Sequence, residues 1–138
     1  MSISLILDPL PRAPYAEAAD KESMTEQHYI YILELENGAY YTGFTADLEK
    51  RYRLHLAGRA SRYTRSFRPL RIARSWKLTA GRGTAMKVEA LIKKRGRRTK
   101  ELLIADPERL TGLICSATGL ELEVCVVSNP PQSAGGLP

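Results

Sequence analysis

Five residues of this sequence have types and spacings that could form a site for phosphate and a divalent cation. They are Tyr31, Tyr41, Arg51, His55 and Glu89. An arginine can clamp a phosphate in fork geometry, and a histidine one helical turn away can donate to the phosphate or carry a proton. A glutamate can hold a divalent cation beside that phosphate. The alternative for Arg51 and His55 is a surface arginine beside a half-buried histidine.

The distribution of charge indicates an anionic partner. Eighteen Lys and Arg residues and one carboxylate, Glu89, lie between Lys50 and Lys100, so this window carries +17 while the rest of the chain carries −11. Basic residues concentrated in one stretch are typical of nucleic-acid binding, since each neutralised phosphate releases counterions. A role in binding a cation would explain why the one acidic residue of this basic window, Glu89, is present. The alternative is a surface ion pair with a Lys or Arg at helical spacing.

The two tyrosines are expected in a β-hairpin. The segment YIYILEL-ENGA-YYTGF, residues 29–44, consists of two β-rich runs around an Asn-Gly turn signal. A two-residue loop would place Tyr31 and Tyr41 on opposite faces, whereas a three-residue loop with Gly38 left-handed pairs Tyr31 with Gly43 and puts both tyrosines on one face. The gap beside Gly43 could then admit a phosphate or a metal-bound water. The alternative is that the tyrosines reflect β propensity and core packing.

Helices and a strand must position the remaining candidates. Asp47 is a good N-cap for a helix over 47–57, on which Arg51 and His55 lie four residues apart and hence on one face. A basic loop is expected over 58–69, followed by a strand over 70–78 with Leu70, Ile72, Arg74 and Trp76 on one face. A helix capped by Thr84 should carry Glu89 and end at Gly96, and a short helix capped by Thr99 should follow. Asp106-Pro107 should begin a further turn with proline at the first helical position, and residues 120–127 should form a strand.

Length and composition favour one compact domain with tails, because 138 residues with 43% hydrophobic content leave no room for two good cores. We expect residues 1–24 to be a poorly ordered extension, 25–107 to form the domain, and 108–138 to be an extension with a short helix, a strand and a flexible end. The sequence shows no signal peptide and no apolar run of membrane length. Cys115 and Cys125 lack zinc or disulfide spacing, so a cytoplasmic location is expected.

These residues resemble the GIY-YIG endonuclease superfamily, and in particular its small stand-alone bacterial members. Tyr29-Ile30-Tyr31 and Tyr41-Thr42-Gly43 resemble the two name-giving motifs. Arg51 and His55 resemble the pair on the family's first helix, and Glu89 resembles its metal-binding glutamate. Tyr29 replaces the first glycine and Thr42 replaces the isoleucine of the second motif, positions that do not carry the chemistry.

The resemblance implies an α+β fold with a small three-stranded, mainly antiparallel sheet flanked by helices. It also implies a metal-dependent endonuclease that hydrolyses phosphodiester bonds in DNA, with a single Mg²⁺ or Mn²⁺ ion held by Glu89. Tyr31 would act as general base on the attacking water, its pKa lowered by the metal and Arg51, while Tyr41 orients the water or the phosphate. Arg51 would stabilise charge on the phosphoryl oxygens, with His55 assisting.

Nucleic acid, most simply DNA, is expected to contact residues along the basic window. These are Gly43, Arg59, Arg62, Tyr63, Arg65, Arg68, Lys87, Lys93 and Lys94. Tyr63 could stack on a base. Two alternatives stay open: a non-catalytic nucleic-acid-binding module of the same fold, and the nuclease subunit of a repair assembly in which a protein partner supplies specificity.

Overall fold

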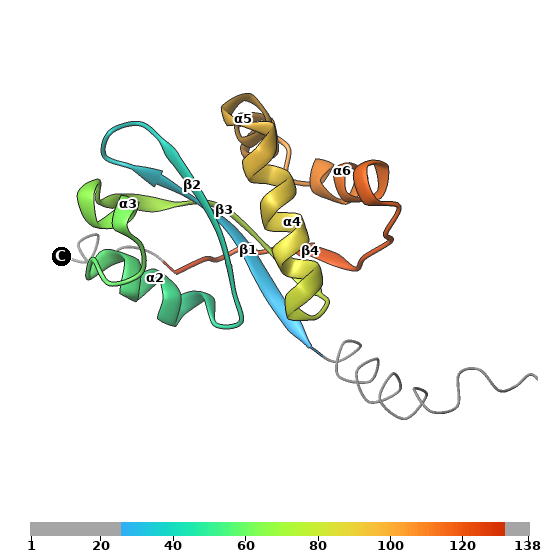
Figure 1. The fold of residues 1–138 in the computed structure, drawn as a ribbon, viewed down its shortest axis with the longest axis horizontal. Coiled ribbons are helices and arrows are strands. Elements are labelled where there is room, and N and C mark those ends of the chain that lie inside the picture. Colours follow the sequence, from blue (N-terminus) through green and yellow to red (C-terminus); the bar gives the residue numbers. More distant parts are fainter. Residues whose placement is uncertain (1–25, 132–138) are drawn as a thin grey trace, which may run out of the picture.

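The computed structural model describes residues 26–131, which form one antiparallel sheet with helices on both sides (Figure 1). The sheet order is β2-β1-β3-β4. The predicted α+β class is confirmed, although the sheet has four strands rather than three. The elements are β1 (Gln27–Leu35), β2 (Tyr40–Thr45), α2 (Leu48–Leu56), α3 (Arg62–Ser66), β3 (Pro69–Thr79), α4 (Arg82–Arg95), α5 (Arg97–Ala105), α6 (Arg109–Thr118) and β4 (Val124–Val126).

Strand β1 is buried on both faces and separates two layers of side chains. Ile30 and Ile32 pack into a cluster that includes residues of α4, α5 and α6. Tyr31 and Leu33 alternate with them and pack into a second cluster, which includes Tyr52 of α2. In Figure 1, α2 and α3 accordingly lie on one side of the sheet and α4 to α6 on the other.

The hairpin has the three-residue loop that would place both tyrosines on one face. Tyr31 pairs with Gly43 and Leu33 pairs with Tyr41. Gly38 has a φ of 85°, and the Leu35 amide donates to the Ala39 carbonyl at 2.9 Å. A left-handed residue closes this loop, and glycine adopts that conformation without a steric penalty. The predicted register is therefore confirmed.

Strand β3 contains a bulge that the alternating pattern did not predict. Ile32 pairs with Arg74, whereas Leu33 pairs with Ile72, so Ala73 is the extra residue. Ile72 consequently packs into the cluster with Tyr31, and Trp76 packs into the opposite one. The expectation that Ile72 and Trp76 share a face is wrong, because the residue inserted between them reverses the facing of the side chains beyond it, up to a second register shift between Arg71 and Pro69.

Several element boundaries differ from the predictions. Asp47 does cap α2, with its carboxylate accepting from the Lys50 amide at 3.1 Å. The predicted basic loop contains a short helix, α3, whose N-cap is Ser61. Helix α4 begins after Gly81 rather than at Thr84, since an extended glycine can precede a helix without a side-chain cap. Helix α5 likewise begins at Arg97 rather than Thr99, and α6 begins at Arg109, after Pro107.

The segment after residue 107 packs onto the sheet. Leu110 and Ile114 of α6 belong to the cluster around Ile30, and β4 pairs with β3. The Trp76 indole donates to the Pro107 carbonyl at 2.8 Å, which fixes the start of this segment. The predictions for residues 1–24 and for the last part of the C-terminal end lie outside the described residues. Within residues 26–131, no helix is long and apolar enough to span a membrane.

Candidate active site

Tyr31 and His55 form a buried hydrogen-bonded pair. The Tyr31 hydroxyl oxygen of β1 lies 2.8 Å from Nε2 of His55 on α2. Tyr31 is 2% exposed and His55 is fully buried. The sequence nominated each residue separately, but nothing in their spacing predicts that they touch. The pair gives the Tyr31 proton an acceptor that water cannot displace.

Tyr41 packs against the same imidazole. Its ring meets that of His55 edge to face, with centroids 5.3 Å apart, and the Lys93 ammonium lies 5.5 Å from the Tyr41 ring centroid. His55 therefore contacts both hairpin tyrosines. Lys93, predicted to bind nucleic acid, is thereby brought from α4 to the edge of the same site.

Gly43 is required because the Tyr31 ring lies across it. A Cβ atom at this position would come within 2.5 Å of Tyr31 Cζ, a distance that real Cβ contacts never show. The gap predicted beside Gly43 is thus occupied by Tyr31 itself, and its interpretation as a seat for phosphate or metal-bound water is wrong. Contact of Gly43 with nucleic acid stays a prediction.

Arg51 borders a hollow of about 390 Å³ and has an unused donor. The hollow is lined by His28, Phe44, Thr45, Ala46, Arg51 and Arg82. The Arg51 Nε is buried and has no hydrogen-bond partner among the described residues. A buried charged donor without an acceptor is costly, so an anion bound here would be stabilising. Arg82 brings a second guanidinium to the hollow. The sequence indicated Arg82 only as one of the many basic residues between Lys50 and Lys100.

Glu89 forms an ion pair with a neighbouring lysine, and its charge also acts on Tyr31 of the candidate site. Its carboxylate lies 3.4 Å from the Lys93 ammonium, one helical turn along α4, and its side chain is 19% exposed. Its negative charge also acts on Tyr31. The ion pair with a Lys at helical spacing, which was the alternative for Glu89, is therefore present. A single Mg²⁺ or Mn²⁺ ion completed by water and phosphate needs only one carboxylate, so this donor set fits such an ion. No group of three or more potential metal ligands occurs among the described residues.

Burial favours the neutral phenol form of Tyr31 over the phenolate. Burial raises the pKa of Tyr31, and the neighbouring Tyr41 and Glu89 act in the same direction, while hydrogen bonding and charge from Arg51 act against them. Arg51 thus acts to lower the pKa of Tyr31, as predicted, but burial raises this pKa by more. Burial, and next the charge of Arg51, lowers the pKa of His55 to about 4. His55 is therefore neutral near pH 7 and can accept the proton of Tyr31.

Thr64 is a site residue that the sequence did not nominate. Its hydroxyl oxygen lies 2.8 Å from Nδ1 of His55, and the residue is 1% exposed. It lies on α3, in a segment expected to be a loop. The spacing of Ser61 and Thr64 was the available signal, because a serine N-cap accepts from the amide three residues later. Here the Thr64 amide donates to the Ser61 hydroxyl at 3.1 Å.

The predicted nucleic-acid contacts other than Gly43, which is buried, are exposed but do not all gather at one place. Tyr63 is 41% exposed, and its hydroxyl accepts from the Asn37 amide at 3.2 Å, which joins α3 to the hairpin loop. Lys94 instead lines a hollow with Ala117 of α6, on another side of α4 from Tyr41. The exposed members are Arg59, Arg62, Tyr63, Arg65, Arg68, Lys87, Lys93 and Lys94. Four arginines thus flank or lie on α3.

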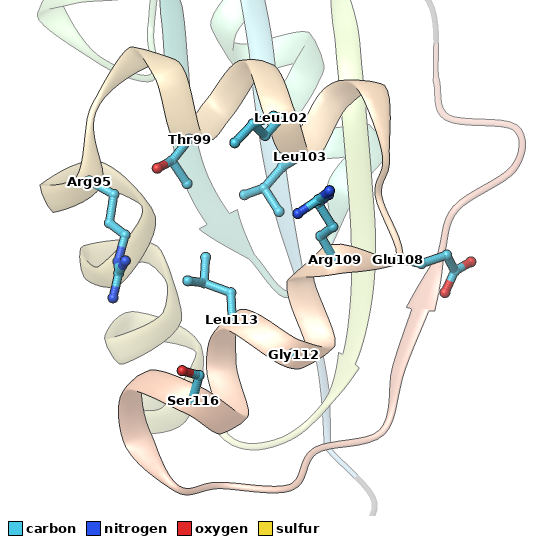
Figure 2. Close-up of a pocket in the computed structure, with 9 residues that line it drawn as sticks. All are labelled: Arg95, Thr99, Leu102, Leu103, Glu108, Arg109, Gly112, Leu113 and Ser116. Atoms are coloured by element: carbon cyan, nitrogen blue, oxygen red, sulfur yellow. The ribbon is translucent and has the colours of Figure 1, made fainter.

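A second hollow lies between α5 and α6 and has a different character. Its volume is about 470 Å³, and Figure 2 shows leucines from both helices around it, with Arg95 and Arg109 beside them. Among the residues that the structure describes, Glu108 is the one carboxylate lining this hollow, and no histidine or tyrosine lines it. This hollow therefore lacks the paired acid–base groups found around His55, and the candidate site remains the one beside β1 and β2.

Comparison with known proteins gives consistent matches. A protein-family model of the GIY-YIG catalytic domain matches residues 27–101. A UPF0213 protein of Halalkalibacterium halodurans is 38% identical over 78 residues, or 56% of this chain and 82% of the relative. A UPF0213 protein of Streptococcus pneumoniae serotype 4 is 34% identical over 83 residues, or 60% and 83% of the two chains. No solved structure matches significantly. Helix α6 and strand β4 lie beyond the matched family domain.

Proposed function

This chain belongs to the GIY-YIG catalytic-domain family, and from that premise we propose that it hydrolyses phosphodiester bonds in DNA with one divalent cation. One observation carries the proposal. The Tyr31 hydroxyl lies 2.8 Å from a buried, neutral His55, beside an Arg51 whose Nε has no partner among the described residues. These two features support a proton path next to a binding place for an anion.

Arg51 is the residue proposed to bind the scissile phosphate. Arg51 borders the hollow, its guanidinium can donate to a phosphoryl oxygen, and Arg82 borders the same hollow. These two cations would stabilise the charge that builds up on the phosphoryl oxygens during the reaction. Tyr41, packed against His55, would orient the attacking water or the phosphate.

Tyr31 and His55 would move the proton together. As the water oxygen bonds to phosphorus and the bond to the leaving oxygen breaks, the water proton passes to Tyr31 and the phenol proton passes to His55 Nε2. The leaving oxygen takes a proton from solvent. This relay avoids a free phenolate, which burial of Tyr31 disfavours. A bound phosphate would offset the charge of Arg51 that lowers the pKa of His55, so substrate binding would itself make His55 a better base.

Glu89 would hold the cation, Mg²⁺ or Mn²⁺, giving up its ion pair with Lys93. A cation bound there supplies polarisation of the phosphate and stabilisation of the leaving oxygen. The arginines around α3 would contact the phosphate backbone of the nucleic acid and would not recognise its base sequence. Specificity would then come from a protein partner, in DNA repair or processing in the cytoplasm.

The test is nicking of supercoiled plasmid with Mg²⁺, Mn²⁺ or EDTA by the wild type, Glu89→Gln and Glu101→Gln. Glu101 is a matched control because it also pairs with a cation one turn away, Arg97 at 2.9 Å, but on α5. We expect nicking only with metal, a loss of about a hundredfold or more in Glu89→Gln, and an unchanged rate in Glu101→Gln.

Two outcomes would count against the proposal. Equal nicking by Glu89→Gln and the wild type would remove the metal-ligand role. Absence of nicking in every protein, with retained salt-sensitive DNA binding, would favour the non-catalytic binding module.

A further inference from the structure

His55 is held at both ring nitrogens, and its second partner comes from a different part of the fold. Nε2 faces Tyr31 of β1 at 2.8 Å, and Nδ1 faces the Thr64 hydroxyl of α3 at 2.8 Å. Both His55 and Thr64 are essentially inaccessible to solvent. A neutral histidine carries one N–H, so only one of these two contacts has His55 as the donor.

The surroundings of Tyr31 decide which nitrogen carries the proton. A guanidinium is a cation that can only donate, and the positive charge of Arg51 acts on the Tyr31 hydroxyl, which favours the orientation with the phenol oxygen toward Arg51. The phenol hydrogen is then free to point to His55, which requires Nε2 to be bare. The imidazole proton accordingly lies on Nδ1 and is donated to Thr64.

Thr64 can accept this proton because its own hydrogen has acceptors elsewhere. The Ser61 hydroxyl lies 2.9 Å from the Thr64 hydroxyl, and the Ser61 carbonyl lies 3.4 Å from it. The chain of donors therefore runs from Tyr31 through His55 and Thr64 to Ser61, and each side-chain polar atom of these four residues has a hydrogen-bond partner.

We propose that Thr64 is a positioning residue that holds His55 in the Nδ1–H tautomer, with a bare Nε2 aimed at the Tyr31 hydroxyl. The chain thereby ties the arginine-bearing helix α3 to the proton path, because Arg62 and Arg65 flank Thr64 in sequence. The catalytic meaning of this inference rests on the proposed function. The tautomer itself can be measured without substrate or metal.

Nitrogen-15 NMR of the side-chain imidazoles tests the proposal. The chain has two histidines, and His28 provides an internal reference, since its Nδ1 lies 3.0 Å from the Ala80 carbonyl, which can only accept. Spectra would be recorded near pH 7 for the wild type, Thr64→Val and Thr64→Ser. Valine has the shape of threonine without the hydroxyl, and serine keeps the hydroxyl.

In the wild type and in Thr64→Ser, we expect both histidines to carry the proton on Nδ1. In Thr64→Val, the His55 signals should shift toward the Nε2–H form while those of His28 stay in place. Nicking by Thr64→Val should fall about tenfold in kcat, which is less than the 10² to 10⁴ that the positioned proton acceptor itself contributes, with KM little changed and serine restoring the rate.

A wild-type proton on Nε2 of His55 would overturn the proposal, as would an unchanged tautomer in Thr64→Val. If the His28 signals of Thr64→Val show that it has not folded, Thr64→Ala takes its place, with the same expected shift. If the tautomers behave as expected but the wild type nicks no DNA, the proposed function fails and the positioning role of Thr64 in the fold is retained.

Discussion

The two layers on either side of β1 differ in what they bury. The layer with α4, α5 and α6 packs Ile30, Ile32 and Trp76 against apolar helix residues. The layer with α2 and α3 buries Tyr31 and, among polar residues, His55 and Thr64. Burying a polar group costs free energy unless the group is hydrogen-bonded, so a buried polar network contributes less to stability than apolar packing of the same volume. The first layer therefore stabilises the fold, and the second carries the candidate chemistry.

The largest effect on stability is expected in the apolar layer. Leu110 of α6 is fully buried beyond the matched family domain, and Leu110→Ala should lower the free energy of unfolding by about 2 to 5 kcal/mol. Urea unfolding followed by the fluorescence of Trp76, the one tryptophan, measures this. Nicking by the fraction that remains folded should be unchanged. A loss below about 0.5 kcal/mol would show that α6 is a dispensable extension.

Acid should weaken the polar layer selectively. The folded-state pKa of His55, about 4, lies below its ordinary value of 6.5, so its neutral form stabilises the fold fully above pH 6.5 and this contribution is lost as the pH falls toward 4. The difference in unfolding free energy between the wild type and His55→Gln should shrink by about 3 kcal/mol between pH 7 and pH 4. A difference independent of pH would contradict the assigned burial of a neutral imidazole.

Adding one methyl group should have opposite effects in the two layers. Gly43→Ala forces the Tyr31 ring to move and should cost about 1 to 3 kcal/mol and most of the nicking activity. Gly112, within α6, has nothing within 4 Å of an added Cβ, so Gly112→Ala should stabilise by about 0.5 to 1 kcal/mol. Thermal unfolding of both variants checks the sign. Equal changes would remove the close approach of Tyr31 as the reason for Gly43.

The sequence predicted the half of the site that follows from local periodicity. The two-residue period of the hairpin and the left-handed Gly38 set the register of Tyr31 and Tyr41. The helical spacing of Arg51 and His55 placed them on one face. Such relations depend only on residues close in the chain, which is why they could be derived.

The remaining features arise from tertiary packing. Thr64 reaches His55 because α3 folds back over α2, and no spacing signals which helix face turns inward. The upward shift in the pKa of Tyr31 comes from burial under that layer, which outweighs the Arg51 contact expected to lower it. The sequence likewise did not predict the bulge at Ala73, because an inserted residue can be identified only from the pairing with the neighbouring strand.

Plasmid nicking by Tyr31→Phe beside Tyr52→Phe tests most directly whether the polar layer carries the chemistry. Each change removes one buried hydroxyl, but that of Tyr31 bonds to His55 whereas that of Tyr52 has no partner among the described residues. We predict that Tyr31→Phe loses about 10² to 10⁴ in rate and that Tyr52→Phe nicks like the wild type with unchanged or slightly higher stability. Equal rates for Tyr31→Phe and the wild type would contradict the role of Tyr31.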